Sequence, residues 1–308
     1  MSVLQLRNIH KNFSGYKAVS GINLNIQEGS IFGLLGPNGA GKTTILRIIT
    51  GIFMADDGDI FFDGHSFDPV TDSAMIGYMP EERGLYKKMK VGEQALYLGQ
   101  LKGLSYHEAA ERVKYWFEKL GMNGWWNKKV EDLSKGMGQK LQFVVTVLHN
   151  PKLIILDEPF SGLDPVNADL IKEEIFNLAK NGSTIIFSTH RMEQVEEICD
   201  HIALINKGKK LLDGTVKDVK QQFKEHIFQI TVDTADVLLS SEAFDIISKE
   251  DHTYRVKIRE GHEQNEVLMH FINQQVPILS FHEILPTLNE IFIRIVSGDK
   301  PVAFPDSI

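Results

Sequence analysis

The feature that most constrains this chain is a glycine-rich segment that ends in a lysine and a threonine, Gly36-Pro37-Asn38-Gly39-Ala40-Gly41-Lys42-Thr43. It matches the pattern G-x-x-x-x-G-K-[ST], directly after the apolar run IFGLL and directly before the helical pattern TILRIIT. In a strand, loop and helix of this kind, backbone N–H groups and the positive end of the helix dipole cradle phosphate groups. The alternative is a glycine turn with an incidental lysine, and the flanking patterns disfavour it.

Chemistry is expected at two places, this loop and a pair of acidic residues. In the loop, Lys42 is predicted to bridge the β- and γ-phosphates of a nucleotide, Thr43 to place its hydroxyl on Mg²⁺, and Thr44 to reach the α-phosphate.

Asp157 and Glu158 directly follow the apolar run LIIL. The carboxyl ends of buried parallel strands are where α/β proteins place ligands. We expect Asp157 to hold Mg²⁺ through its water shell and Glu158 to be the general base for the attacking water. Two solvated loop carboxylates are the alternative.

The pattern along the chain predicts an α/β core with a mostly parallel sheet, followed by a small α+β domain. Apolar strand-like runs occur in SIFGLLG, LIILDEP and STIIFSTH, and helical spacing occurs at about 42–51, 93–120, 135–149, 167–180 and 191–199. No convincing strand pattern lies between about 85 and 150, which indicates a helical insertion. We expect a core at 1–220, an accessory domain at 226–298 and a tail at 299–308.

The accessory domain is expected because the pattern changes after the linker VKDVKQQFK. Three segments alternate like strands, namely IFQITVD, TYRVKIRE and PILSFHEI. Each is followed by helical spacing, in ADVLLSSEAFDIIS, EQNEVLMHFINQ and TLNEIFIRIV.

Charge and cysteine content indicate which partners and which cellular compartment to expect for this chain. The chain carries 33 Lys+Arg against 41 Asp+Glu, a net charge of −8, and neither part is basic overall. Proteins that bind nucleic acid through phosphates usually present a basic face, so we expect no nucleic-acid partner. The single cysteine, Cys199, is expected to be a buried thiol in a reducing compartment. No secretory signal or membrane span is apparent, so any membrane role is expected to need a partner chain.

Further segments match a known family when taken in order. They are Leu133-Ser134-Lys135-Gly136-Met137, Ser161-Gly162-Leu163-Asp164, His190 in the run STH, and Phe13 near the N-terminus. With the phosphate loop and the acidic pair, residues 3–220 resemble the ATP-binding subunits of ABC transporters. In that resemblance the first segment is the signature, the second is the D-loop, His190 is the switch histidine, and Phe13 stacks on adenine.

The resemblance implies an ATPase that uses ATP and Mg²⁺ and dimerises head to tail, most simply as a homodimer. Ser134 and Gly136 of one protomer would close on the γ-phosphate bound by the other. Lys42, Glu158 and His190 would be the catalytic residues, with His190 hydrogen-bonding the γ-phosphate. The subunit would lie in the cytoplasm, peripheral to the inner face of the membrane, on a separately encoded permease.

Two positions depart from the family pattern. Glu81 stands after Tyr78-Met79-Pro80, where the family has a glutamine. A carboxylate still binds Mg²⁺ or a water, so Glu81 is predicted to contribute to the ATP and metal sites, but it lacks the amide donor. Met137 replaces the closing glutamine of the signature. Three sequence segments resemble bacterial sodium- or drug-efflux ABC-2 ATPases, namely EERGLYKKM, SKGM and the C-terminal LNEIFIRIV. This resemblance implies export.

Several alternatives stay open. Tyr16 is a rival to Phe13 for the adenine, and simple packing is an alternative for both. The cluster Arg83, Lys87, Lys88 and Lys90 is interpreted either as a solvated face or as a contact with a permease or anionic lipid. Trp125 and Trp126 are interpreted as packing residues, with a surface that faces a partner as the alternative. The rival functions are a soluble ABC-type ATPase of DNA repair or translation and a nucleotide-binding regulator without catalysis.

Overall fold

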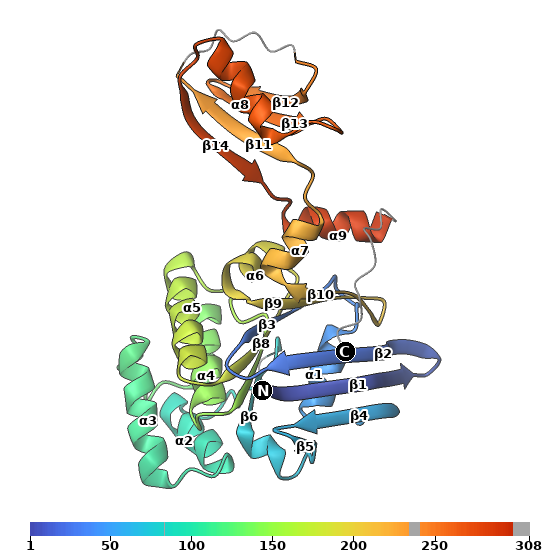
Figure 1. Ribbon diagram of the computed structural model, residues 1–308. Helices are drawn as coiled ribbons and strands as arrows, with labels where there is room; N and C mark the ends of the chain where they lie inside the picture. Colours follow the sequence, from blue (N-terminus) through green and yellow to red (C-terminus); the bar gives the residue numbers. More distant parts are fainter. Residues whose placement is uncertain (83, 234–240, 298–308) are drawn as a thin grey trace. The chain divides into compact units, whose positions relative to one another are not determined.

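A computed structural model describes residues 1–82, 84–233 and 241–297 of the chain (Figure 1). It divides into two compact units, Met1–Val216 and Lys217–Ile308. Arg83 of the basic cluster and the expected tail at 299–308 lie outside the described residues.

The first unit contains two sheets. A four-stranded antiparallel sheet has the order β2-β1-β4-β5, with bounds Tyr16–Gln27, Ser2–Phe13, Asp57–Phe62 and His65–Ser66. A six-stranded sheet has the order β10-β9-β3-β8-β7-β6, with bounds Lys209–Thr215, His201–Asn206, Ile31–Leu35, Thr184–Thr189, Leu153–Asp157 and Ile76–Met79. Strands β9, β3, β8, β7 and β6 run parallel, and only the edge strand β10 pairs antiparallel. The prediction of an α/β core with a mostly parallel sheet is confirmed.

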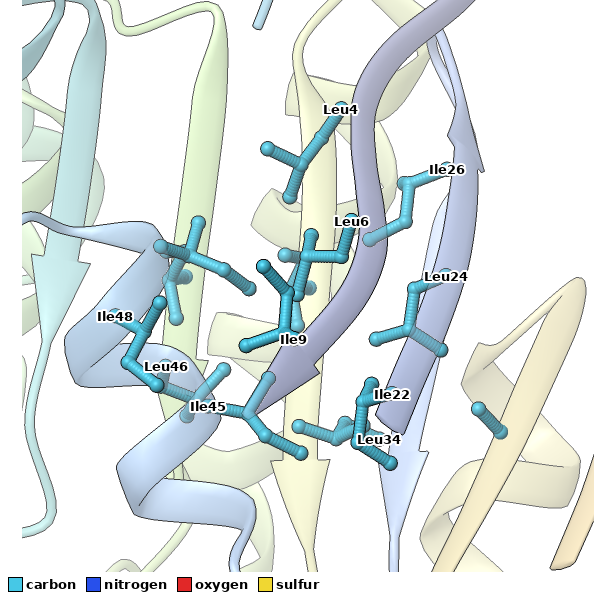
Figure 2. Close-up of a cluster of buried hydrophobic side chains, with 14 of the residues drawn as sticks. Leu4, Leu6, Ile9, Ile22, Leu24, Ile26, Leu34, Ile45, Leu46 and Ile48 are labelled. Atoms are coloured by element: carbon cyan, nitrogen blue, oxygen red, sulfur yellow. The ribbon is translucent and has the colours of Figure 1, made fainter. Parts of the chain in front are cut away.

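A hydrophobic cluster joins the two sheets through helix α1, Lys42–Ile49 (Figure 2). Its buried side chains include Leu4, Leu6 and Ile9 of β1, Ile22, Leu24 and Ile26 of β2, and Ile45, Leu46 and Ile48 of α1. The strand residues alternate between faces, and the helix residues repeat at three- and four-residue spacing, so each element turns one apolar side to the same core. This packing fixes α1 and therefore the glycine loop that precedes it.

The helical insertion contains α2 (Val91–Leu101), α3 (Tyr106–Lys119), α4 (Lys135–Val147) and the short 3₁₀ turn Val130–Asp132. The pattern over 93–120 is not one continuous helix. Gly103, with φ 90°, ends the first part, and Ser105 caps α3 in a capping box with Glu108. After β7, helices α5 (Pro165–Lys180) and α6 (Met192–Ile198) both pack against β8.

The second unit is built on an antiparallel sheet with its own core. The strand order is β12-β13-β11-β14, with bounds Phe244–Glu250, Thr253–Ile258, Ile227–Val232 and Ile278–Ile284. The helices are α7 (Val216–Gln222), α8 (Gln264–Asn273) and α9 (Leu288–Ser297). A separate cluster contains Phe228, Tyr254 and Phe271, and the Phe228 ring stacks on Phe281 with centroids 5.0 Å apart.

One predicted helix of this unit is wrong. The spacing in ADVLLSSEAFDIIS predicts a helix, but the end of this segment forms strand β12. Phe244 pairs with Ile258 and Ile246 with Val256, and a register shift follows Ile246. The extra residue of this bulge disturbs the two-residue alternation that would indicate a strand. Residues 234–240 of the same segment lie outside the described part.

Candidate functional site

The glycine loop turns tightly because two of its residues have no room for a side chain. Gly36 and Gly41 have φ values of 148° and 107°. A Cβ atom on Gly36 would lie 2.1 Å from the Ile205 carbonyl oxygen, and one on Gly41 would lie 2.4 Å from that of Ala18. Gly41 is the N-cap of α1. The loop therefore needs glycine for close approach of backbone, and it directs the first turn of α1 toward the site.

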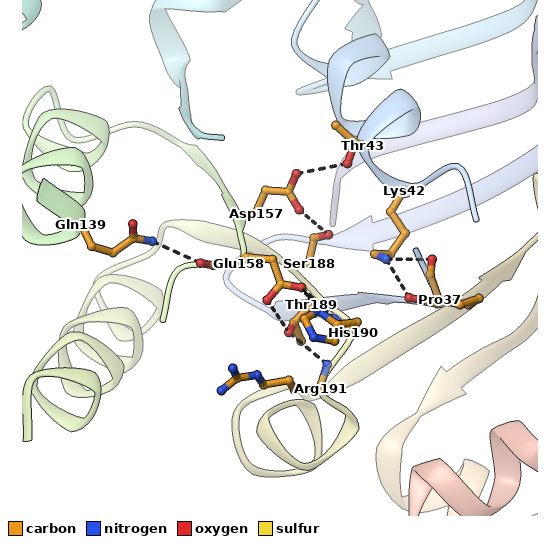
Figure 3. Close-up of polar contacts among 11 residues, drawn as sticks. Pro37, Lys42, Thr43, Gln139, Asp157, Glu158, Ser188, Thr189, His190 and Arg191 are labelled. Carbon is orange, nitrogen blue, oxygen red and sulfur yellow. Dashed lines mark hydrogen bonds and ion pairs between the residues drawn. The ribbon is translucent and has the colours of Figure 1, made fainter. Parts of the chain in front are cut away.

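Lys42 is a buried cation at the start of this helix. Its side chain is 8% exposed, and Nζ donates hydrogen bonds to the carbonyl oxygens of Gly36 at 2.7 Å and Pro37 at 3.2 Å (Figure 3). Burial lowers the pKa of Lys42, and the nearby charges of Asp157 and Glu158 act in the opposite direction. The ammonium group thus donates to neutral carbonyls, an arrangement that anionic phosphate oxygens are suited to complete.

Asp157 ends strand β7 as a buried carboxylate. Its Oδ1 accepts a hydrogen bond from Ser188 Oγ at 2.8 Å, and its Oδ2 accepts one from Thr43 Oγ1 at 3.3 Å (Figure 3). Burial raises the pKa of Asp157, although the Ser188 bond lowers it. A hydroxyl and a carboxylate placed side by side are hard oxygen ligands of the kind that Mg²⁺ binds together with phosphates. These residues fit a magnesium ion.

Glu158 is held by the end of the neighbouring strand β8. Its φ of 52° lies in the left-handed region, and its N–H donates to the Ser188 carbonyl at 2.9 Å. Oε2 accepts from Thr189 Oγ1 at 3.0 Å. Oε1 accepts from the His190 N–H at 2.9 Å and lies 2.6 Å from His190 Nδ1. The parallel pairing of β7 with β8 thus brings Glu158 and His190 together.

A cavity of about 340 Å³ joins the loop to these carboxylates. It is lined by Tyr16, Ala18, Asn38, Gly39, Ala40, Gly41, Lys42, Thr43, Thr44, Glu81, Asp157 and Glu158. Tyr16 also donates from its hydroxyl to the Gly39 carbonyl at 3.2 Å. Phe13 is not among the lining residues, and its ring packs edge to face against Phe53 at 5.4 Å. Of the two aromatic candidates, only Tyr16 reaches the cavity.

The signature segment, Leu133–Met137, contacts the D-loop segment, Ser161–Asp164. Neither segment lines this cavity. Ser134 caps α4, with its hydroxyl accepting from the Met137 N–H at 3.2 Å. A Cβ atom on Gly136 would lie 3.1 Å from the Gly162 carbonyl oxygen. Asp164 caps α5 by accepting from the Asn167 N–H at 3.0 Å, a bond that lowers its pKa. Within one chain, the phosphate loop and Ser134 do not share a site.

The comparisons with known proteins decide the family. The model described as ABC transporter matches residues 19–161. The chain is 42% identical over 300 residues to the ABC transporter ATP-binding protein YhaQ of Bacillus subtilis (strain 168), covering 96% of this chain and 99% of that protein. This chain belongs to the ABC transporter ATP-binding proteins. Members of the family are ATPases that bind ATP, so this ABC protein is an enzyme of that class.

The second unit matches a more specific model. Residues 214–296 of this ABC ATPase match the C-terminal domain of ATP-binding protein DrrA1-3-like proteins. The linearmycin resistance ATP-binding protein LnrL of Bacillus subtilis (strain 168) is 32% identical over 283 residues, covering 91% of this chain and 86% of that protein. A solved structure, described as the ATP binding subunit of an ABC transporter, has a TM-score of 0.68 and 28% identity. It covers 72% of this chain and 93% of that one.

Other expectations concern surfaces of this ABC ATPase. Cys199 is 7% exposed, and burial raises the pKa of its thiol, as expected for a packing residue. Trp126 packs against Phe117 with ring centroids 5.9 Å apart. Lys87, Lys88 and Lys90 are exposed. In the part of the chain that the structure describes, none of the helices is long and apolar enough to cross a bilayer.

Sequence reasoning missed four site residues. Ser188 and Thr189 hold the two carboxylates through their hydroxyl groups, and Gln139 and Gln142 bind loops at the site through their amides. The run STH contains the two hydroxyls, but only its histidine belongs to a recognisable motif. The glutamines lie 20 and 62 residues from the carbonyls of Pro159 and Pro80 that they contact, so no local pattern indicates these bonds.

Proposed function

We propose that this chain is the Mg-ATP-binding and hydrolysing subunit of an ABC transporter that powers export through a separate membrane permease. The observation that carries the proposal is the cavity where Lys42, Thr43, Asp157 and Glu158 converge with Glu81. It combines a phosphate cradle, a cation, hard metal ligands and a carboxylate able to accept a proton, which are the parts that phosphoryl transfer to water needs.

In this proposal each side chain has one task. The loop N–H groups and Lys42 bind the phosphates. Thr43 and Asp157 would hold Mg²⁺, and the bound ion would supply positive charge to the phosphates. Glu158 orients the attacking water and accepts its proton. His190, whose Nδ1 lies 2.6 Å from Glu158 Oε1, hydrogen-bonds the γ-phosphate. Glu81 adds a third carboxylate at the cavity, beside Asp157 and Glu158, and Tyr16 or Phe13 stacks on the adenine.

Ser134 and Gly136 are proposed to act on the nucleotide of a partner copy. They lie at the start of α4, and neither lines the cavity of its own chain. The N-terminus of a helix is suited to an anion. A head-to-tail homodimer with two shared ATP sites would use both residues. We propose that this dimer lies on the cytoplasmic face of the membrane, bound to the permease.

Export is proposed from two similarities. LnrL is described as a resistance protein, and removing a toxic compound from the cell is one source of resistance. The C-terminal domain matches the DrrA-like model. Co-expression with a candidate permease, a chain with several apolar spans of about 20 residues, tests the assembly: we expect the two chains to copurify from the membrane fraction.

Glu158→Gln tests the catalytic proposal. The amide keeps the shape and still hydrogen-bonds water, but it cannot accept the proton at neutral pH. We expect hydrolysis to fall by roughly 10²–10⁴-fold with ATP binding retained. Light scattering should show a monomer without nucleotide and a dimer of twice 34.8 kDa with Mg-ATP.

Adding Ser134→Arg should abolish that dimer, because a bulky side chain would stand against the partner's loop. A Glu158→Gln protein that hydrolyses ATP at the wild-type rate, or that stays monomeric in saturating Mg-ATP, would contradict the mechanism.

A further inference from the structure

Helix α4 contains two buried glutamines whose side-chain amides donate hydrogen bonds to loops of the ATP site. Gln139 and Gln142 are each 3% exposed. Gln139 Nε2 donates to the carbonyl oxygen of Glu158 at 3.2 Å (Figure 3). It also donates to the carbonyl oxygen of Pro159 at 2.9 Å. Gln142 Nε2 donates to the carbonyl oxygen of Pro80 at 2.6 Å. One helix therefore binds two separate loops.

Both loops carry a carboxylate of the cavity. Glu158 has its backbone in the left-handed region, at φ 52°, which a non-glycine residue keeps only when its surroundings hold it there. The Gln139 bonds hold the peptide groups directly after this residue. Pro80 is the residue before Glu81, and proline offers only a carbonyl for such a bond. The two glutamines thus fix the backbone beside Glu158 and beside Glu81.

The same helix begins at the signature. Ser134 is its N-cap, and Gly136 lies against the Gly162 carbonyl of the D-loop. An α-helix rises 1.5 Å per residue, so Gln139 and Gln142 lie only about 8 and 12 Å along the axis from Ser134. A short helix moves as a rigid body. Any shift of the N-terminal end of α4, at Ser134, therefore also shifts the side-chain amides of Gln139 and Gln142.

We propose that Gln139 and Gln142 are positioning residues for ATP hydrolysis. Through them, α4 transmits the docking of Ser134 on the partner's nucleotide to Glu158 and Glu81 of its own chain. The two ATP sites of the dimer are then linked by one helix in each protomer. This inference rests on the proposed ATPase function and adds to it the residues that align its carboxylates.

The test compares three glutamine-to-methionine variants of the full chain. Methionine keeps the length and flexibility of glutamine but has no N–H donor. Gln139→Met removes the hydrogen bonds to the Glu158 and Pro159 carbonyls, and Gln142→Met removes the hydrogen bond to the Pro80 carbonyl. Gln94→Met is the matched control: Gln94 is a fully buried glutamine of α2, and neither of its amide atoms has a hydrogen-bond partner among the described residues.

The measurements are ATP turnover, affinity for a fluorescent ATP analogue, the Mg²⁺ concentration for half-maximal activity, and the melting temperature. We expect Gln139→Met to lower turnover by about tenfold to a hundredfold, with affinity within about twofold of wild type, because small misplacement of a catalytic group is costly. We expect Gln142→Met to raise the Mg²⁺ requirement severalfold. Gln94→Met should match wild type in turnover and Mg²⁺ requirement.

Two results would overturn the inference. One is wild-type turnover and Mg²⁺ dependence in both variants. The other is a loss of activity in all three variants that follows their loss of melting temperature, since that would indicate general packing. A wild-type protein that binds no ATP or does not hydrolyse it would instead overturn the proposed function, and the positioning roles with it.

Discussion

Asp157 and Glu158 are adjacent carboxylates with different hydrogen-bond partners. Asp157 is buried and receives one hydroxyl from Ser188 and one from Thr43. Glu158, whose backbone is left-handed, accepts hydrogen bonds from Thr189 and His190. Two neighbouring carboxyl groups in unlike surroundings are suited to unlike roles, in agreement with the metal binding proposed for Asp157 and the proton transfer proposed for Glu158.

Lys42→Ala removes the only ammonium group lining the cavity, as far as the structure describes it. We expect hydrolysis to be abolished and nucleotide affinity to fall at least tenfold, about 1.4 kcal/mol. Titration with a fluorescent ATP analogue measures the affinity. Lys152→Ala, which removes a surface lysine paired with Asp63, is the control and should bind ATP normally. Unchanged turnover in Lys42→Ala would refute the assignment.

Glu81→Gln restores the amide that the family usually has at this position. Glu81 lines the cavity, so as a ligand of Mg²⁺ or of a water it should influence metal use more than ATP binding. We expect unchanged ATP affinity with an altered Mg²⁺ dependence or altered coupling to transport. A wild-type Mg²⁺ titration together with wild-type transport would show that this carboxylate is a bystander.

At the residue scale, the sequence predicts the groups that belong to local motifs. The loop, Asp157 and Glu158 are consecutive residues next to clear strand or helix patterns. Their neighbours Ser188 and Thr189 come from the adjacent strand, and only the strand pairing reveals them. The family pattern favours Phe13 over Tyr16 for the adenine, but the order of the two along β1 and β2 does not tell which one faces the loop.

At the scale of elements, the strands of the first unit that the sequence predicts correctly are those buried on both faces. In the second unit the alternating segments IFQITVD, TYRVKIRE and PILSFHEI also form the predicted strands, β11, β13 and β14. β3, β7 and β8 are apolar on consecutive residues, which makes them evident in the sequence. The antiparallel sheet of β1, β2 and β4 is not evident there. One side of β1 and β2 faces the core and the other includes exposed polar residues, so neither strand contains a continuous apolar run. Long-range pairing, and not local composition, establishes them.

His149, directly after the end of α4, should make the free energy of unfolding depend on pH. His149 follows this helix, and burial, aided by the positive charge of Lys102, lowers its pKa to about 4. In the unfolded chain a histidine titrates near about pH 6.5. Below that pH the unfolded state binds a proton that the folded state does not, so this group makes stability fall as pH drops from about 6.5 to 4.

A His149→Gln variant should therefore lose less stability than wild type between pH 7 and pH 5. Urea unfolding at the two pH values measures the difference. Equal pH dependence in the two proteins would show that the imidazole is not responsible.

At the scale of the whole molecule, each unit has a hydrophobic cluster among its described residues. One cluster joins the two sheets and α1 of the first unit, and the other contains Phe228, Tyr254 and Phe271 of the second. They share no residue. We predict that a chain truncated after Val216 stays soluble and binds ATP with wild-type affinity, because all the cavity residues precede that point. Aggregation or loss of ATP binding in the truncated protein would mean that the two units depend on each other to fold.

The contact between Glu158 and His190 has a consequence for the cell's energy supply. In this structure the Glu158 carboxylate already faces three donors of its own chain, from Thr189 and from the backbone and ring of His190. A carboxylate that is engaged in this way is poorly available to a water molecule. We expect the monomer to hydrolyse little ATP until it dimerises on Mg-ATP. A cell that keeps the subunit dilute then spends little of its nucleotide pool on idle copies.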